Sequence, residues 1–265
     1  MNKNKADIYR AMVDMSSRDV QHDAFKYIKR WWKNGKWNYE NKDESKAKSV
    51  INDSAATVKN ALPERPLFDA LSNVKWKTKA MSIAEDAATV NPNYDPKNPE
   101  YRENCSYCTI AYDLRRRGYD VEAKPTVPED KEVKDDDLNI IEIMDLYKGG
   151  SIDDIRTWGE IAKEKGISKD NVDHEKAWDL ISNDMTKYPD GARGHFALNW
   201  KCGGGHDIAW EKVDGKITFV DAQTNKITTQ EDFLEDYILR CSNFYYMRTD
   251  HLKPSKEMLK YVKSK

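Results

Sequence analysis

The chain has 265 residues, of which 38% are hydrophobic and 34% charged, and its 44 Lys and Arg against 46 Asp and Glu give a net charge of -2. This composition excludes collagen, low-complexity disorder and most membrane proteins, and the balanced charge gives no electrostatic reason to expect a nucleic-acid or membrane partner. No segment approaches the ~18 consecutive apolar residues of a spanning helix, and the first residues lack the apolar core of a secretory signal. The default location is therefore the cytosol.

The first ninety residues are predicted to be helical. Apolar residues recur at helical spacing in four segments, 8–15, 16–32, 45–61 and 66–90, and Gly35 follows the second of them. This part carries no recognisable chemistry. We therefore predict a helical N-terminal domain over residues 1–90, with a role in docking or attachment.

A dense stretch of Pro and Asn over residues 91–99 contains three prolines, which forbid regular structure. We place the domain boundary there, so that a second domain covers residues 91–265. It opens with a predicted helix over residues 105–117, with Asn104 at its N-cap and Gly118 at the position that favours a left-handed turn. Cys105 then lies in the first turn of this helix.

The middle of the second domain is predicted from charge and capping residues. The acidic run over residues 129–137 indicates a solvated loop or, alternatively, a docking surface for a basic partner. Three further elements are expected over residues 139–146, 151–165 and 174–184. The second is a helix capped by Ser151, and the third is also a helix.

A β-hairpin follows. Residues 194–201 alternate loosely, Gly203 to Gly205 interrupt them, and strands over 206–213 and 216–223 flank an Asp214-Gly215 turn. The turn fixes a register in which His206 and Asp221 are diagonal neighbours, about 7 Å apart between backbones and within reach of a hydrogen bond. A capping box from Thr228 to Glu231 predicts a last helix through Ile238.

These residues contain the parts of a site for acyl transfer. The positive end of a helix favours the thiolate of Cys105, and an imidazolium nearby lowers the thiol pKa further. In the predicted roles Cys105 attacks an amide carbonyl, His206 moves the proton, Asp221 fixes the tautomer of His206, and the Cys105 amide helps hold the oxyanion. Cys108 lies one turn deeper, where the dipole has faded, so Cys105 is the preferred nucleophile.

Other interpretations use the same residues. A helix cysteine is often only a packing residue, and a histidine in a strand is often structural. Cys105, Cys108, Cys202 and His206 would also make a Cys3His zinc site, although the two halves lie far apart and the second is a glycine run. That glycine run lacks the helix and Lys-Ser/Thr of a phosphate-binding loop.

Two segments resemble a known family. Asn104-Cys105-Ser106-Tyr107-Cys108 with the sequence of residues 112–123, and Gly205-His206 with the sequence of residues 213–224, look like the papain-fold toxin family, also called the toxin glutamine deamidase domain. The resemblance covers roughly residues 91–225. It departs at Asn225, where the family commonly has glycine, but Asn also tolerates a left-handed turn.

The resemblance implies an α+β fold, with a papain-like core in which the cysteine helix packs on an antiparallel sheet behind the helical N-terminal domain. It implies that Cys105, His206 and Asp221 are catalytic. Asn104, Gln223 and Gly205 are expected to contact the substrate or oxyanion. No cofactor is expected.

The expected reaction is deamidation of a glutamine in a protein substrate, by a toxin, effector or phage-encoded enzyme. The resemblance also suggests an immunity protein or phage virion components as partners, and a cytoplasmic or virion-associated location. Two alternatives stay open beside the zinc-stabilised binding module. One is a cysteine protease with the same triad, and the other is a phage head-associated structural protein whose triad is unused.

Overall fold

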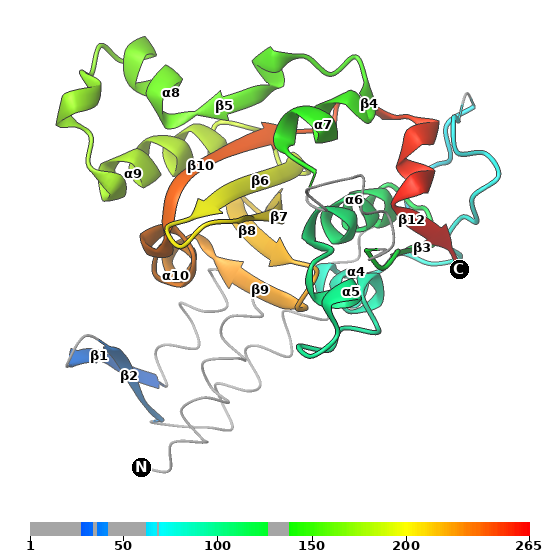
Figure 1. Ribbon diagram of the computed structural model, residues 1–265, viewed down its shortest axis with the longest axis horizontal. Helices are drawn as coiled ribbons and strands as arrows, with labels where there is room; N and C mark the ends of the chain where they lie inside the picture. Colours follow the sequence, from blue (N-terminus) through cyan, green and yellow to red (C-terminus); the bar gives the residue numbers. More distant parts are fainter. Residues whose placement is uncertain (1–27, 34–35, 42–61, 68, 127–137) are drawn as a thin grey trace.

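The computed structural model describes residues 62–67, 69–126 and 138–265, together with the backbone of residues 28–33 and 36–41 (Figure 1). Its centre is a six-stranded antiparallel sheet with the strand order β5-β10-β6-β7-β8-β9. The strands of this sheet are β5 (Ile155–Thr157), β6 (Arg193–Trp200), β7 (Gly205–Val213), β8 (Lys216–Asp221), β9 (Lys226–Thr229) and β10 (Cys241–Arg248).

The other elements are helices and short strands. The helices are α4 (Ile83–Val90), α5 (Pro99–Arg102), α6 (Cys105–Arg116), α7 (Ile140–Asp145), α8 (Trp158–Glu164), α9 (His174–Met185) and α10 (Gln230–Asp236), with short 3-10 turns η1 (Ile152–Asp154), η2 (Lys169–Asn171), η3 (Ile238–Arg240) and η4 (Lys256–Lys260). Three two-stranded sheets pair β1 (Ile28–Lys33) with β2 (Lys36–Asn41), β3 (Val121–Ala123) with β12 (Val262–Ser264), and β4 (Tyr147–Lys148) with β11 (Lys253–Pro254).

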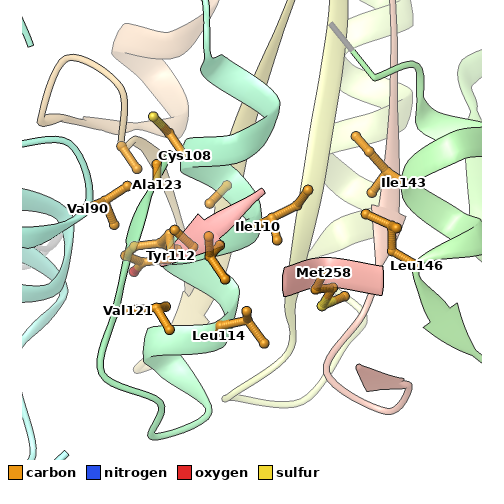
Figure 2. Packing of buried hydrophobic residues seen from close by; sticks show 14 of the residues in the cluster. Val90, Cys108, Ile110, Tyr112, Leu114, Val121, Ala123, Ile143, Leu146 and Met258 are labelled. Atoms are coloured by element: carbon orange, nitrogen blue, oxygen red, sulfur yellow. The ribbon is translucent and has the colours of Figure 1, made fainter. Parts of the chain in front are cut away.

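The two faces of the central sheet are covered by different helices, because successive side chains of a strand point to opposite faces. Ala209 of β7 and Val220 of β8 pack in one cluster with the apolar side of α6, part of which Figure 2 shows. Ile208, Trp210 and Phe219 pack in a second cluster with α8, α9 and α10. Helix α6 therefore lies on one face of the sheet and α8 to α10 on the other.

The elements around the cysteine and the hairpin agree with the sequence prediction. Helix α6 begins at Cys105, and Gly118 follows it with a φ of 105°. A side chain there is excluded as well, since a Cβ atom on Gly118 would lie 2.4 Å from the Trp76 ring. In the hairpin Val213 pairs with Lys216 across an Asp214-Gly215 turn in which both residues have positive φ. The predicted register is therefore confirmed, as is the α+β class with the cysteine helix packed on an antiparallel sheet.

Two helix predictions before residue 91 are wrong where the structure describes them. Residues 28–32 were expected to end a helix, but they belong to β1, which pairs with β2 from Ile28↔Asn41 to Lys33↔Lys36. The helix expected over residues 66–90 begins only at Ile83, because Ser82 and Glu85 form a capping box there. The helices expected over 8–15 and 45–61, and the start of the one over 16–32, lie outside the described residues.

Three elements of the second domain also differ from the prediction. Residues 151–165 are not one helix: Ser151 caps only η1, β5 follows, and α8 starts after Thr157, whose hydroxyl accepts from the Glu160 amide. The last helix is capped by Thr229, the last residue of β9, whose hydroxyl accepts from the Asp232 amide, and not by Thr228 one residue earlier. Beyond that helix lies β10, a strand inside the sheet that the prediction missed.

The described part of the chain before residue 91 contacts the second domain directly. Asp86 of α4 accepts hydrogen bonds from Lys77 at 3.0 Å and from Arg115 of α6 at 3.0 Å, all three side chains being buried. The pair between Arg115 and Asp86 crosses the predicted boundary, and the division into two domains stays a prediction. The acidic run over 129–137 lies outside the described residues. Within the described part of the chain, no helix has the length and apolar character needed to cross a membrane.

Candidate active site

A cavity of about 310 Å³ opens where α6 begins beside the ends of β7 and β8. Its wall includes Cys105, Gly205, His206, Asp221 and Gln223, together with Arg102, Glu103, Trp200, Thr224 and Tyr237. Five of the six residues predicted for the site therefore line one cavity. Cys105 is 4% exposed and occupies the first position of α6, where the helix dipole favours a negative charge.

His206 and Asp221 are hydrogen-bonded, as the hairpin register predicts. Nε2 of His206 lies 3.0 Å from Oδ2 of Asp221. The other carboxylate oxygen, Oδ1, accepts from the backbone amides of Gln223 at 3.2 Å and Thr224 at 3.3 Å. This turn of backbone holds the carboxylate through the oxygen that does not contact the histidine.

The environment of Asp221 keeps its carboxyl group ionised. Burial opposes ionisation, but the charge of His206 and the hydrogen bonds from His206 and Thr224 outweigh it, so the pKa of Asp221 lies below its ordinary value. Because Asp221 is only 4% exposed, its charge is little screened by water. Its electrostatic interaction with the imidazole of His206 is therefore strong.

Cys108 is a packing residue. Its side chain is fully buried in the cluster that Figure 2 shows, and its Sγ donates to Oδ1 of Asn104 at 3.4 Å. Burial, followed by the charges of Asp221 and Asp207, raises the pKa of this thiol well above its ordinary value. Cys108 therefore stays protonated, which leaves Cys105 as the cysteine of the cavity.

The side chain of Asn104 does not lie in the cavity wall, where it was expected to contact the substrate or oxyanion. Asn104 stands at the N-cap of α6, but its side chain makes no capping hydrogen bond. Its Oδ1 accepts instead from Nε2 of Gln223 at 3.3 Å and from Nδ2 of Asn91 at 3.4 Å, and its Nδ2 donates to the carbonyl of Lys124 at 3.0 Å. Asn104 is fully buried and does not line the cavity, so it orients Gln223 rather than facing the cavity itself.

Gly205 is the first residue of β7 and lies close against the backbone of β6. A Cβ atom there would lie 3.2 Å from the carbonyl oxygen of Leu198. The two glycines before it, Gly203 and Gly204, both have positive φ, at 96° and 77°. The glycine run is therefore the tight connection between β6 and β7, and it delivers His206 to the cavity.

The structure does not bring the alternative zinc ligands together. Cys108 is buried and hydrogen-bonded to Asn104, whereas Cys202 is exposed in the connection between β6 and β7. Among the described residues, which include Cys105 and His206, no three His, Cys, Asp or Glu side chains are grouped so that they could hold a metal ion. The zinc-stabilised alternative is therefore not supported by the placement of its ligands.

Sequence reasoning missed two aromatic residues of the cavity. The rings of Trp200 and Tyr237 have their centroids 6.0 Å and 6.2 Å from that of His206, with planes inclined by 23° and 7°. Trp200 ends the strand before the glycine run, a position that could have suggested a cavity wall. Tyr237 lies sixteen positions after Asp221, and only the packing of α10 brings it there.

Comparison with known proteins gives a family match over the segment that contains the candidate site. Residues 103–226 match the family model described as Papain fold toxin 1, glutamine deamidase. The match begins just before α6 and ends at the first residue of β9, so it includes Cys105, His206, Asp221 and Gln223. No curated protein and no solved structure matches the chain.

Proposed function

We propose that this chain, whose residues 103–226 match the papain fold toxin 1, glutamine deamidase family, hydrolyses the side-chain amide of a glutamine in a protein substrate. The family indicates a cysteine-dependent enzyme that acts on protein. The observation that carries the specific proposal is the shared cavity of Cys105, His206 and Asp221, with His206 hydrogen-bonded to Asp221. In this proposal the three residues form the catalytic triad.

The hydrogen bond to Asp221 sets the tautomer of His206. Because Nε2 faces a carboxylate, it carries the proton, and Nδ1 presents its lone pair. Nδ1 is then the nitrogen that accepts the proton of the Cys105 thiol. The resulting thiolate is stabilised by the imidazolium and by the start of α6.

Attack proceeds through a covalent thioester. The Cys105 thiolate bonds to the side-chain amide carbon of glutamine, and the carbonyl π electrons move to oxygen. When the tetrahedral intermediate collapses, its C–N bond breaks, and the His206 imidazolium gives its proton to the leaving nitrogen, which departs as ammonia. His206 then removes a proton from water, which attacks the thioester. Collapse breaks the C–S bond and yields glutamate and the Cys105 thiol.

Two donors support the oxyanion in this proposal. The backbone N–H of Cys105 lies in the first turn of α6, at the positive end of the helix dipole. The side-chain amide of Gln223 lines the cavity, and one of its two N–H groups is directed to Asn104, so the second can serve the oxyanion. Donors of this kind each contribute roughly 100-fold or more to turnover.

The test is to incubate the protein with the blocked dipeptide carbobenzoxy-Gln-Gly and with casein. Wild type and Cys108→Ala should release ammonia and convert glutamine to glutamate with the peptide backbone intact, and Cys105→Ala should do neither. Cleavage of casein without ammonia release would replace this proposal by peptide hydrolysis. No turnover of either probe or of a wider panel of glutamine-containing proteins, with an unreactive Cys105, would favour an unused triad.

A further inference from the structure

The hydroxyl group of Tyr237 lies beside the triad. It donates a hydrogen bond of 3.1 Å to Oδ2 of Asp221, the same oxygen that accepts from Nε2 of His206 at 3.0 Å. One carboxylate oxygen therefore has two side-chain donors, one from the histidine and one from the tyrosine. The hydrogen bond from the tyrosine hydroxyl therefore restricts the position of this oxygen.

The aromatic ring of Tyr237 also lies nearly parallel to the ring of His206. The two planes differ by 7°, with centroids 6.2 Å apart, and Trp200 lies 6.0 Å from His206 and 6.3 Å from Tyr237. The three rings are mutual neighbours with nearly parallel planes. Rotation of the imidazole out of its plane would therefore meet aromatic side chains of the cavity wall.

The fold brings Tyr237 to this place through α10. This helix starts at the Thr229 cap, directly after β9, and packs back on the sheet through Phe233, whose ring stacks on Phe219 of β8 at 3.9 Å and 13°. Tyr237 comes one helical turn later and stacks on Phe233 at 4.7 Å. It therefore reaches the end of β8, where Asp221 is located.

Tyr237 acts as a neutral donor. Burial raises the pKa of its phenol, and the charge of Asp221 and the hydrogen bond to it act in the same direction. Asp236 raises this pKa further, and Arg240 opposes it. Lys226 lies over the ring at 5.3 Å and pairs with Asp236 at 2.8 Å. The hydroxyl proton therefore remains available to Asp221 whenever the carboxylate is ionised.

We infer that Tyr237 is a positioning residue of the active site, which holds the Asp221 carboxylate and the His206 ring in the orientation that proton transfer from Cys105 needs. The inference rests on the proposed function. It extends the site beyond the segment that matches the family, because Tyr237 follows residue 226. It also gives α10, which has no residue in the triad, a part in the reaction.

The test measures alkylation of Cys105 by iodoacetamide, followed by peptide mapping, in wild type and Tyr237→Phe. Phenylalanine keeps the ring and removes only the donor. Near pH 6, where the thiolate depends on a well-placed imidazolium, the variant should react about tenfold more slowly, since a hydrogen bond to a charged group is lost. Near pH 9.5, where a thiol ionises without help, the two rates should agree within about twofold.

Tyr246→Phe is the matched control. Tyr246 is buried and donates to Oδ2 of Asp184 at 2.7 Å, but it does not line the cavity, so its variant should label like wild type at both pH values. A general loosening of the fold would speed labelling in Tyr237→Phe instead of slowing it near pH 6. Such a gain, or a Tyr237→Phe profile equal to wild type, would overturn the assignment alone. A wild-type protein without rapid labelling near pH 6 would overturn the proposed function as well.

Discussion

The hydroxyl group of Thr109 lies 3.0 Å from the carbonyl oxygen of Asp207, the residue that follows His206 in β7. The same hydroxyl lies 3.1 Å from the carbonyl oxygen of Cys105, one helical turn earlier in α6. A single buried side chain thus connects the start of the cysteine helix with the strand of the histidine. This bridge helps to fix the separation of the two groups that exchange a proton in the proposed reaction.

Replacing Thr109 by valine tests the bridge. Valine keeps the shape and removes the donor, which leaves a buried carbonyl short of a partner, so the free energy of unfolding should fall by about 1–3 kcal/mol. The kcat for the glutamine probe should fall by about tenfold, because the cysteine and histidine lose part of their alignment. Thr109→Ser keeps the hydroxyl and should retain much of the activity. Equal kcat in Thr109→Val and wild type would show that the bridge plays no part in the reaction.

Asp221→Asn should leave the fold intact and reduce kcat by about 100-fold or more. The amide removes the negative charge that stabilises the imidazolium, and its N–H group can face Nε2 of His206 and favour the wrong tautomer. The measurement is steady-state turnover, with circular dichroism to confirm folding. Near-normal turnover in a folded Asp221→Asn protein would remove this residue from the mechanism.

The two cysteines of α6 should respond in different ways to replacement. Cys105→Ala should abolish turnover while the thermal unfolding midpoint changes little. Cys108→Ala should retain turnover but lose about 1 kcal/mol of stability, because Cys108 is fully buried in the core. Turnover and thermal unfolding of both variants check this pair of expectations. Loss of activity in Cys108→Ala with activity retained in Cys105→Ala would move the nucleophile one turn along the helix.

A buried ion network around Asp113 predicts how stability depends on pH. Asp113 accepts from Arg117 at 2.8 Å, from Arg193 at 3.1 Å and from the Tyr147 hydroxyl at 2.9 Å. Burial opposes its ionisation, but the charges of Arg117 and Arg193 outweigh it and hold the pKa of Asp113 well below its ordinary value. Asp113→Asn should therefore destabilise the protein by ~3 kcal/mol at neutral pH, because two partly buried arginines lose a buried charged partner.

The sign of the pH dependence follows from the lowered pKa. A group with a depressed pKa in the folded state stabilises the fold above its unfolded pKa, about 3.9 for Asp, and this stability is lost as pH falls further. The difference between wild type and Asp113→Asn should thus be full at pH 7 and shrink below about pH 4. Urea titrations at several pH values measure it, with the exposed Asp145→Asn as control. A difference that does not change between pH 7 and pH 3 would contradict the ionised network.

The sequence was sufficient for the parts of the site that depend on local rules. The Asp214-Gly215 turn determines the register of β7 and β8, and the register places His206 beside Asp221. The start of α6 at Cys105 was visible from its flanking residues, and Asn225 indeed has the left-handed φ of 55° expected where the family has glycine. These features are set by a few neighbouring residues, so their patterns could be interpreted without the fold.

Features that depend on distant packing were not predictable in the same way. Strand β10 was missed, although Phe244 and Tyr246 alternate inward, because the helix before it was expected to close the domain. Tyr237 contacts Asp221 only because α10 packs on β8. Asn104 was placed correctly at the N-cap, but its absence from the cavity wall was not predictable, since three donors from other segments and from the helix reach its side chain.

The most direct test of the proposed mechanism is the rate of iodoacetamide labelling of Cys105 as a function of pH, in wild type and in His206→Ala. Cys202 is exposed and serves as the internal reference. If Cys105 is activated by His206, it should react faster than Cys202 well below pH 8, and this advantage should disappear in His206→Ala. A Cys105 that reacts no faster than Cys202 below pH 8, or equally fast without His206, would contradict the proposed triad.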